Sequence, residues 1–471
     1  MKHTKTYSEY GGGDTELWEY YNRFDEPPDL SNSDWINTPE LLSSNVIKTR
    51  IQKMAAHLKT AIPLSRLVHW RDMDVSLGLA QHLGWRIRRS QTHPAFNCLL
   101  ANFYQVATLG QSDVMSISLN NNSYASLKTA KSDNPLGVSA GITKYVSDIV
   151  AGSFVRKHTG YHDKTGRNSG RNTALVLSDR LIDGLLEIKV PNVIIPQIEP
   201  IRWVIRDADF RDIPQSIVPE ALLDEVQNNR NLLLAYNEFI RSYHVTVSRP
   251  DRREFHECIA FHMKYYGEGM DLHSRINGGR YQFMKKEIRR PFLRINGERT
   301  VEVDISESHP TIVYALAGKP LREDELGKCY WLTDSEPAPY VRDVVKVGMA
   351  CMLNSSDRSR AELAITHTAN MGDIDLHEIS SAKKLVDKIL ARHPEVADYF
   401  FRPDIGMRCM ETEGKIMLET MRWGMQNDIP VLPLHDAVIC RESDVKKVAE
   451  ALREASCAVL GKPMKISVKV A

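Results

Sequence analysis

The sequence has almost no net charge, no long apolar run and no closely spaced cysteines, and each absence excludes a class of protein. With 61 Lys and Arg against 60 Asp and Glu the net charge is +1, so affinity for nucleic acid must come from local patches. No apolar run approaches the roughly 18–20 residues that a membrane-spanning helix needs, which predicts no membrane partner. Because no apolar signal-peptide segment follows residues 1–5, we expect a cytoplasmic location.

The seven cysteines are odd in number and far apart, and none forms a CxxC pair. This pattern favours reduced cysteines over a disulfide framework or a zinc site. The chain does have enough apolar side chain for a packed core, since 42% of its 471 residues are hydrophobic. A chain of this length is expected to form about two to four domains.

Composition and patterning divide the chain into four parts. Residues 1–139 begin with a Gly- and Pro-rich arm and continue with mostly helical spacing, and no chemistry can be assigned to them. Residues 140–195 combine a helix with β-rich runs. Residues 196–280 carry a long helical pattern, most clearly over 218–268, and residues 281–471 hold the motifs that carry chemistry.

The second part, 140–195, resembles a winged helix. Helical spacing over 142–153 is followed by two β-rich runs, 154–161 and 172–177, around a polar tip. One acidic residue accompanies five basic residues in this hairpin: Arg156, Lys157, Lys164, Arg167 and Arg171. A basic wing is a common way to grip phosphates, but a solvated hairpin explains the pattern equally well.

A second basic stretch lies between His273 and Thr300, where two acidic residues and three aromatic residues accompany eight basic ones. This combination favours a groove that follows a polyanionic backbone over a merely solvated face. The basic residues are Arg275, Arg280, Lys285, Lys286, Arg289, Arg290, Arg294 and Arg299.

Two aspartates follow β-type patterns at distant points in the sequence. Alternation of apolar and acidic residues over 301–305 places Asp304 near a strand end, ahead of a short helix over 310–318. Far downstream, Asp436 interrupts an apolar run over 429–440, which predicts a tight turn between strands. Burying one carboxylate alone is costly, whereas two carboxylates sharing metal ions form a minimal two-metal phosphoryl-transfer site. Oxygen ligands beside a triphosphate indicate two Mg²⁺ ions, with Mn²⁺ as a substitute.

Between the aspartates, Arg342, Lys346, Ala350 and Asn354 recur every four residues and so share one face of a predicted helix. Two cations on this face could cradle a triphosphate. An RxxxK spacing alone is weak, and its position between the two aspartates is what gives it value.

The order of these motifs resembles that of family A DNA polymerases, especially short members from phages and bacterial mobile elements. The segment VEVDISESHP is similar to motif A, the helix that carries Arg342 and Lys346 to the start of motif B, and PLHDAVIC to motif C. The resemblance covers roughly residues 200–471. It implies an α+β fold of the right-hand type, with an antiparallel palm sheet, helical fingers inserted at about 320–425 and a thumb-like helical segment over 196–280.

Within this palm we expect strands near 299–305, 430–440 and 464–470. A helix over 443–459 is expected to back them, with Ser443 as its N-cap and Gly461 at its end.

The resemblance implies a nucleotidyltransferase for DNA replication, which extends a primer-template or a single-stranded template from dNTPs. Asp304 and Asp436 would be the catalytic metal ligands, joined by the carbonyl of Ile305. Arg342 and Lys346 would bind the incoming triphosphate, and Lys346 would also protonate the leaving pyrophosphate.

For DNA, the resemblance implies that His435 lies near the primer end and that Arg280 contacts the duplex. The basic residues Lys285, Lys286 and Arg289 would add to this DNA-binding surface. A small replication protein is a possible further partner.

Departures from the family pattern leave alternatives open. His309 stands where the family has a glutamate that helps exclude ribonucleotides, and Ala350 and Asn354 stand at positions that are usually aromatic. The nucleotide site would therefore select sugars differently, as in a primase-polymerase that starts chains and takes NTPs. Ala437 after motif C leaves open a non-catalytic DNA-binding replication protein with a decayed palm, and a phosphohydrolase would also use two carboxylates.

A proofreading exonuclease is not expected. Its paired acidic motifs have one isolated match, at residues 14–16, in the Gly- and Pro-rich arm.

Overall fold

The computed structural model describes residues 61–64, 69–70, 73–85, 94–119, 142–159, 172–187, 193–195, 199–206, 212–214, 222–250, 253–266 and 272–469. The chain forms two compact units, unit 1 (Met1–Ile198 and Val247–Cys258) and unit 2 (Glu199–Thr246 and Ile259–Ala471). Both units mix helices with mostly antiparallel strands, so the fold is α+β. Among the described helices, none is both long enough and apolar enough to cross a membrane.

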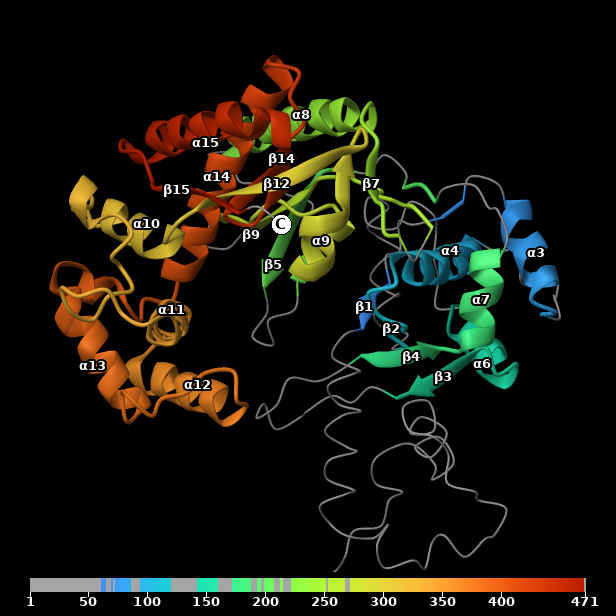
Figure 1. Cartoon of the computed structure of the whole chain (residues 1–471), viewed down its shortest axis with the longest axis horizontal. Coiled ribbons are helices and arrows are strands. Elements are labelled where there is room, and N and C mark those ends of the chain that lie inside the picture. The colour runs from blue at the N-terminus through green and yellow to red at the C-terminus, as the bar shows by residue number, and fades with distance from the viewer. Residues whose placement is uncertain are drawn as a thin grey trace, which may run out of the picture. The chain divides into compact units, whose positions relative to one another are not determined.

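Unit 1 is a small sheet with helices around it (Figure 1). Its described elements are β1 (Ile62–Pro63), α3 (Met73–His82), α4 (Pro94–Leu109), β2 (Val114–Ile117), α6 (Ile142–Ala151), β3 (Val155–His158), β4 (Thr173–Leu177), α7 (Asp179–Glu187) and β8 (Phe255–His256). The sheet order is β1-β2-β4-β3, with β1 parallel to β2 and the other pairs antiparallel. Helix α4 is buried along nearly its whole length; most of its residues are apolar, and the side chains of Asn102 and Thr108 bond to carbonyls of the same helix. The expected helix and two β-runs of residues 140–195 are present as α6, β3 and β4.

Unit 2 contains two sheets. Its described strands are β5 (Ile201–Arg206), β6 (Asp212–Pro214), β7 (Val245–Val247), β9 (Met263–Tyr266), β10 (Leu272–His273), β11 (Leu293–Ile295), β12 (Glu298–Ile305), β13 (Leu432–Leu434), β14 (Ala437–Arg441) and β15 (Ile466–Lys469). The larger sheet runs β13-β14-β12-β11-β7, and β15 also pairs with β12. The smaller sheet runs β10-β9-β5-β6, with β5 parallel to β9. The strands expected near 299–305 and 464–470 are present as β12 and β15, and the segment near 430–440 forms two strands, β13 and β14.

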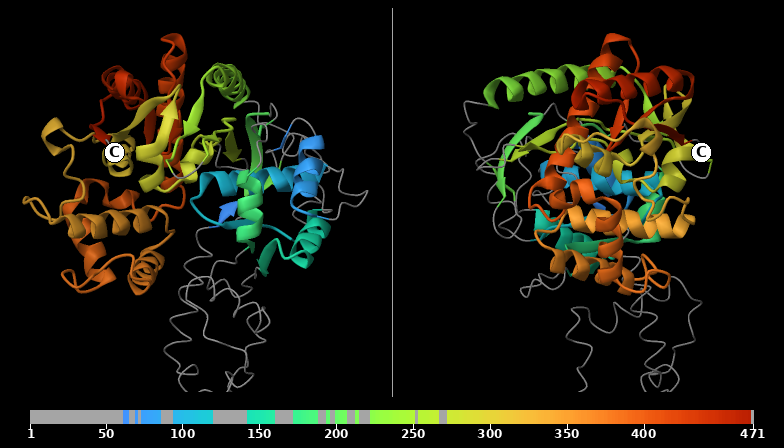
Figure 2. Two further views of the ribbon diagram at one scale, coloured as in Figure 1. Left: turned by 45° about the vertical axis from the view of Figure 1, so that its right-hand side comes forward. Right: turned by 90° about the vertical axis from the view of Figure 1, so that its left-hand side faces the viewer.

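Most helices of unit 2 fall into two groups. Its described helices are α8 (Leu223–Arg241), α9 (Lys286–Phe292), α10 (Ser308–Leu316), α11 (Pro339–Leu353), α12 (Arg358–Asn370), α13 (Ala382–Arg392), α14 (Ile405–Gln426) and α15 (Val445–Leu460), with 3₁₀ turns at Arg280–Phe283, Glu323–Glu325, Pro394–Tyr399 and Glu442–Asp444. Helices α8, α14 and α15 gather beside the larger sheet, whereas α11, α12 and α13 form a separate cluster (Figures 1 and 2). This cluster lies within the segment expected to form fingers.

Local sequence accounts for the ends of several of these helices. Asp357 and Ser381 act as N-caps of α12 and α13, each accepting a hydrogen bond from the backbone N–H of the third residue of its helix. Helix α15 ends at Gly461, whose φ of 74° is the left-handed conformation that glycine adopts readily.

Two expectations about helices in unit 2 are wrong. The long helical pattern over 218–268 ends as a helix at Arg241 and continues as short strands, because its later residues pair with neighbouring strands. The N-cap position of α15 is Asp444, not Ser443, because a 3₁₀ turn precedes the helix. The N–H of Ser443 instead donates to Glu298 Oε1 at 2.8 Å.

Candidate active site

Two strand ends bring Asp304 and Asp436 together in unit 2. Strand β12 pairs antiparallel with β14 so that Asp304 lies opposite Ala437, and the N–H of Ile305 donates to the Asp436 carbonyl at 3.1 Å. Burial raises the pKa of Asp436 to about 6, and the negative charges of Glu413 and Asp304 act in the same direction. Asp304 therefore lies close enough for its carboxylate to disfavour ionisation of Asp436.

Asp436 occupies a two-residue turn that the strand register defines. Leu434 of β13 pairs with Ala437 of β14, leaving His435 and Asp436 as the turn. His435 is exposed and has a φ of 58°, a conformation in which glycine is far more common. The expected tight turn is present, and its backbone is held in a strained conformation at the residue beside the carboxylate.

Asp304 is bonded from the other side by β15. This strand places Ser467 directly opposite Asp304, and Lys469, one pleat farther on, extends its ammonium to Asp304 Oδ2 at 2.7 Å. Sequence reasoning missed Lys469, although the period of β15 puts it on the same face of the sheet as Asp304. The ammonium neutralises this carboxylate within the protein itself.

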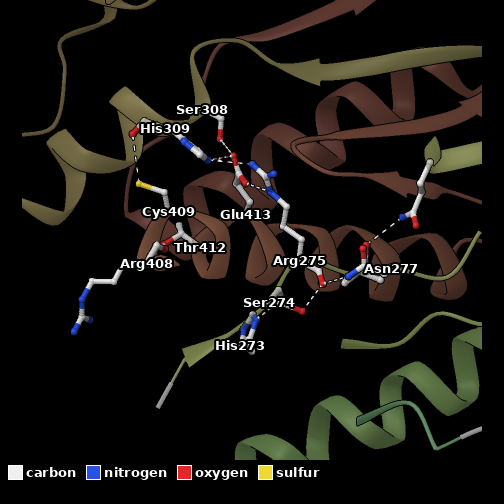
Figure 3. A network of polar contacts seen from close by, with 12 residues as sticks. His273, Ser274, Arg275, Asn277, Ser308, His309, Arg408, Cys409, Thr412 and Glu413 are labelled. Atoms are coloured by element: carbon white, nitrogen blue, oxygen red, sulfur yellow. Dashed lines mark hydrogen bonds and ion pairs between the residues drawn. The ribbon is translucent and has the colours of Figure 1, made fainter. Parts of the chain in front are cut away.

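A third carboxylate, Glu413 of α14, completes the acidic group. Its side chain is 0% exposed, and its oxygens accept hydrogen bonds from Arg275 Nε at 2.5 Å and Ser308 Oγ at 2.7 Å (Figure 3). Burial alone would raise the pKa of Glu413, but His309 and then Arg275 outweigh it and lower this pKa to about 2. Glu413 is therefore a fixed negative charge beside Asp436.

His309 is enclosed by this same network. Its Nε2 lies 3.0 Å from Arg275 Nη2 and 3.2 Å from Glu413 Oε1, so both residues hold the ring (Figure 3). The motif A resemblance located His309 but not its partners. Neither Glu413 nor Arg275 belongs to a local sequence motif. The one feature that could have predicted Glu413 is that it is an acidic residue among apolar ones on the buried face of a long helix.

Helix α11 carries the four residues expected on one face. Lys346 and Ala350 are exposed, and Asn354 is the C-cap, donating to the Ala350 carbonyl at 2.8 Å. The opposite face is buried and includes Val345 and Met349, so the shared-face prediction is confirmed.

Within α11, Arg342 reaches toward the turn that follows Asp304. Its guanidinium lies 3.8 Å from Glu307 Oε1 and stacks over the Tyr330 ring at 5.0 Å. Glu307 is buried with a φ of 55°, and its other oxygen accepts the Cys329 N–H at 2.9 Å. Arg342 is thus linked to the β12–α10 turn, whereas the Asn354 side chain bonds within its own helix.

The basic stretch before β12 divides into structural and exposed residues. Arg289 and Arg290 both donate to Glu302 of β12, at 2.8 and 3.0 Å, so these guanidinium groups hold α9 against the sheet. Lys285 and Lys286 are exposed, and Arg280 lies partly buried in the 3₁₀ turn Arg280–Phe283. That turn is tied to β13 because Tyr281 donates to the Pro433 carbonyl at 2.7 Å.

The predicted wing residues lie in unit 1. Arg156 and Lys157 are on β3, which forms an antiparallel hairpin with β4. Lys164, Arg167 and Arg171 lie outside the described residues. Their role in binding DNA stays a prediction.

The donor set around Asp304 and Asp436 fits a divalent cation. Both carboxylates come from strand ends, and the raised pKa of Asp436 shows that positive charge nearby would be favourable. The Ile305 carbonyl lies on the same strand end, so oxygen donors of the kind Mg²⁺ prefers are gathered there.

No family model matches this chain, and no curated protein matches it. Among solved structures, it is similar to the POL domain of Pol1 from M. smegmatis in complex with DNA primer-template and dNTP. The similarity covers 84% of this chain and 80% of that chain, with 13% sequence identity and a TM-score of 0.29. A likeness this weak leaves the function to be argued from the residues of the site.

Proposed function

We propose that this chain is a template-directed DNA polymerase that uses two Mg²⁺ ions, has no proofreading exonuclease and replicates phage or mobile-element DNA. The observation that carries the proposal is the juxtaposition of Asp304 and Asp436 at neighbouring strand ends, with the pKa of Asp436 raised to about 6. Two carboxylates that repel one another form a site that gains stability by holding cations.

In the proposed reaction the 3′-oxygen of the primer attacks the α-phosphorus of a dNTP, and the bond to pyrophosphate breaks. When bound, two Mg²⁺ ions supply activation of the attacking hydroxyl and charge for the leaving oxygen. Asp304, Asp436 and the Ile305 carbonyl would hold them. Arg342 would bind the triphosphate, and Lys346 would donate a proton to pyrophosphate as it leaves.

Lys469 and Glu413 refine this picture. The Lys469 ammonium must leave Asp304 Oδ2 when a cation binds there, so it acts as an internal competitor. Glu413 keeps its charge at any working pH and positions Arg275 and His309 beside the site.

For DNA, Lys285 and Lys286 are the strongest candidates in the basic stretch, because both side chains are exposed. Arg280 and His435 would contact the duplex and the primer end. The wing cations Arg156 and Lys157 are candidates for phosphate contacts from unit 1.

A primase-polymerase that accepts NTPs is the second candidate. It is favoured by His309, whose ring is held by Arg275 and Glu413 where the family has a glutamate that excludes ribonucleotides. Exposed Ala350 offers no aromatic ring to the nucleotide.

The test is Mg²⁺-dependent extension of a labelled primer by wild type, Asp304→Asn and Asp436→Asn. We expect each variant to lose at least about 10²-fold in rate, because charge stabilisation of the transition state depends on both carboxylates. Asp404→Asn is the matched control, since Asp404 is a half-exposed partner of Arg408. Wild-type extension by either site variant would overturn the proposal.

The same assay separates the two candidates when each of dNTPs and NTPs is offered on primed and unprimed templates. Incorporation of dNTPs from a primer alone supports the polymerase, whereas chain initiation with NTPs supports the primase-polymerase.

A further inference from the structure

Three potential metal ligands meet on the other side of α14 from Glu413. Glu225 of α8, His273 of β10 and Glu411 of α14 each offer one ligand atom, and these atoms all lie within 4.8 Å of one another. Glu411 and Glu413 are two residues apart on one helix, so they point in different directions. In Figure 3 the His273 ring lies at the opposite end of the drawn network from Glu413 and His309.

His273 is prepared to act as a ligand. Its side chain is 0% exposed, and its Nδ1 lies 3.0 Å from the Ser274 carbonyl, which assigns the ring proton to Nδ1. Nε2 therefore carries a lone pair, and this buried atom has no hydrogen-bond partner among the described residues. A histidine that donates one N–H to a carbonyl and presents its other nitrogen is the usual arrangement of a metal-binding imidazole.

The backbone of α14 makes room for this ring. A Cβ atom at Gly414 would lie 2.9 Å from His273 Cε1 and 3.0 Å from the Ser274 carbonyl oxygen. Only a residue without a side chain lets the imidazole lie this close to the helix.

The two glutamates supply negative charge, and each already has a partner within the protein. Glu225 Oε1 accepts from the Tyr265 hydroxyl at 3.0 Å, which orients that carboxylate. Glu411 is 12% exposed on its side chain, and Lys415 lies 3.0 Å from its Oε1. A cation bound by Glu411 would take over the charge compensation that Lys415 gives.

We propose that Glu225, His273 and Glu411 bind one divalent transition-metal ion of the Zn²⁺ class, with water completing the coordination. One imidazole nitrogen and two carboxylates suit Zn²⁺, whereas Mg²⁺ prefers oxygen donors only. The ion would join α8, β10 and α14, which lie far apart in sequence. This site is independent of Asp304 and Asp436 and of the proposed polymerase activity.

The test is titration of the metal-stripped full chain carrying Asp304→Asn and Asp436→Asn, so that the proposed Mg²⁺ site cannot contribute. Zn²⁺ binding is followed by calorimetry, and Co²⁺ binding by the visible absorption of a tetrahedral site. We expect one ion per chain, no displacement by excess Mg²⁺ and a Tm rise of about 5 °C or more at saturating Zn²⁺.

In the same background, His273→Gln and Glu411→Gln should each weaken Zn²⁺ binding at least about tenfold. Glu419→Gln on the same helix is the matched control, because Glu419 is half-exposed and pairs with Arg422. Glu225→Gln provides a partly exposed third variant if His273→Gln fails to fold. Absence of Zn²⁺ binding, or equal binding by the control and the ligand variants, would overturn the proposal.

Discussion

Replacing Arg275 by methionine should destabilise unit 2, because it leaves the Glu413 carboxylate buried without its arginine. The pKa of Glu413 falls from 4.5 to about 2, which corresponds to about 3 kcal/mol in favour of the charged form. His309 and Ser308 supply part of that stabilisation and remain in the variant. Breaking a buried ion pair typically costs about 3–5 kcal/mol, so we expect a loss of about 2–3 kcal/mol here.

The measurement is thermal and urea unfolding of the full chain at pH 7, where this loss should lower Tm by about 5–10 °C. Arg408→Met is the matched control, since Arg408 pairs with Asp404 on the surface, and it should cost under about 1 kcal/mol. Adding Glu413→Gln to Arg275→Met should recover part of the loss, because no buried charge is then left.

The pH dependence gives an independent check. A carboxyl whose folded pKa is lowered contributes stability above 4.5 that is lost as the pH falls toward about 2. The difference between wild type and Arg275→Met should therefore shrink over that interval. A loss at pH 7 no larger than that of Arg408→Met would refute the reasoning.

Three further predictions follow from other contacts. Asp436→Asn should raise the Tm of the chelator-treated protein at pH 8, by the equivalent of about 2 kcal/mol, and should change it little at pH 4. The reason is that ionisation of a carboxyl whose pKa is raised to about 6 opposes folding. An unchanged Tm at pH 8 would contradict this. Tyr236→Phe should lower the free energy of unfolding, measured in urea, by about 1–3 kcal/mol, because the Tyr236 hydroxyl bonds both backbone groups of Val431, at 2.8 and 3.0 Å. Tyr243→Phe should lower it less, because the Tyr243 hydroxyl bonds exposed Asp428. Equal losses in the two variants would contradict this prediction. Lys469→Met should lower the Mg²⁺ concentration for half-maximal primer extension about two- to fivefold, and an increase would show that Lys469 is not a competitor.

Much of the framework around the aspartates was predictable because its signals are local. Alternation over 301–305 and the apolar run around Asp436 identify strands, since side chains that alternate across a strand face different environments. The four-residue spacing that starts at Arg342 likewise identifies one exposed helix face. These patterns depend on neighbours within a few residues, which a sequence displays directly.

The missing members of the site depend on pairings between remote segments. Lys469 reaches Asp304 only through the register of β15 on β12, and Glu413 reaches His309 only because α14 packs beside α10. Glu302, an acidic residue of the alternating pattern over 301–305, is buried because α9 covers it with two arginines. Tertiary contacts decided these positions, and no local pattern encodes them.

The path of the chain between β12 and β14 has a consequence for how the protein could diversify. The chain leaves the larger sheet after β12, passes through α11, α12 and α13, and returns at β13 and β14, of which β14 pairs with β12. Spacing between the carboxylates is set by the ladder between β12 and β14, so lengthening or trimming the α11–α13 cluster leaves it unchanged. Adding one residue inside either strand would turn a carboxylate to the wrong face. The α11–α13 cluster can therefore change in length as a unit, whereas the proposed metal site tolerates no change of length in the ladder.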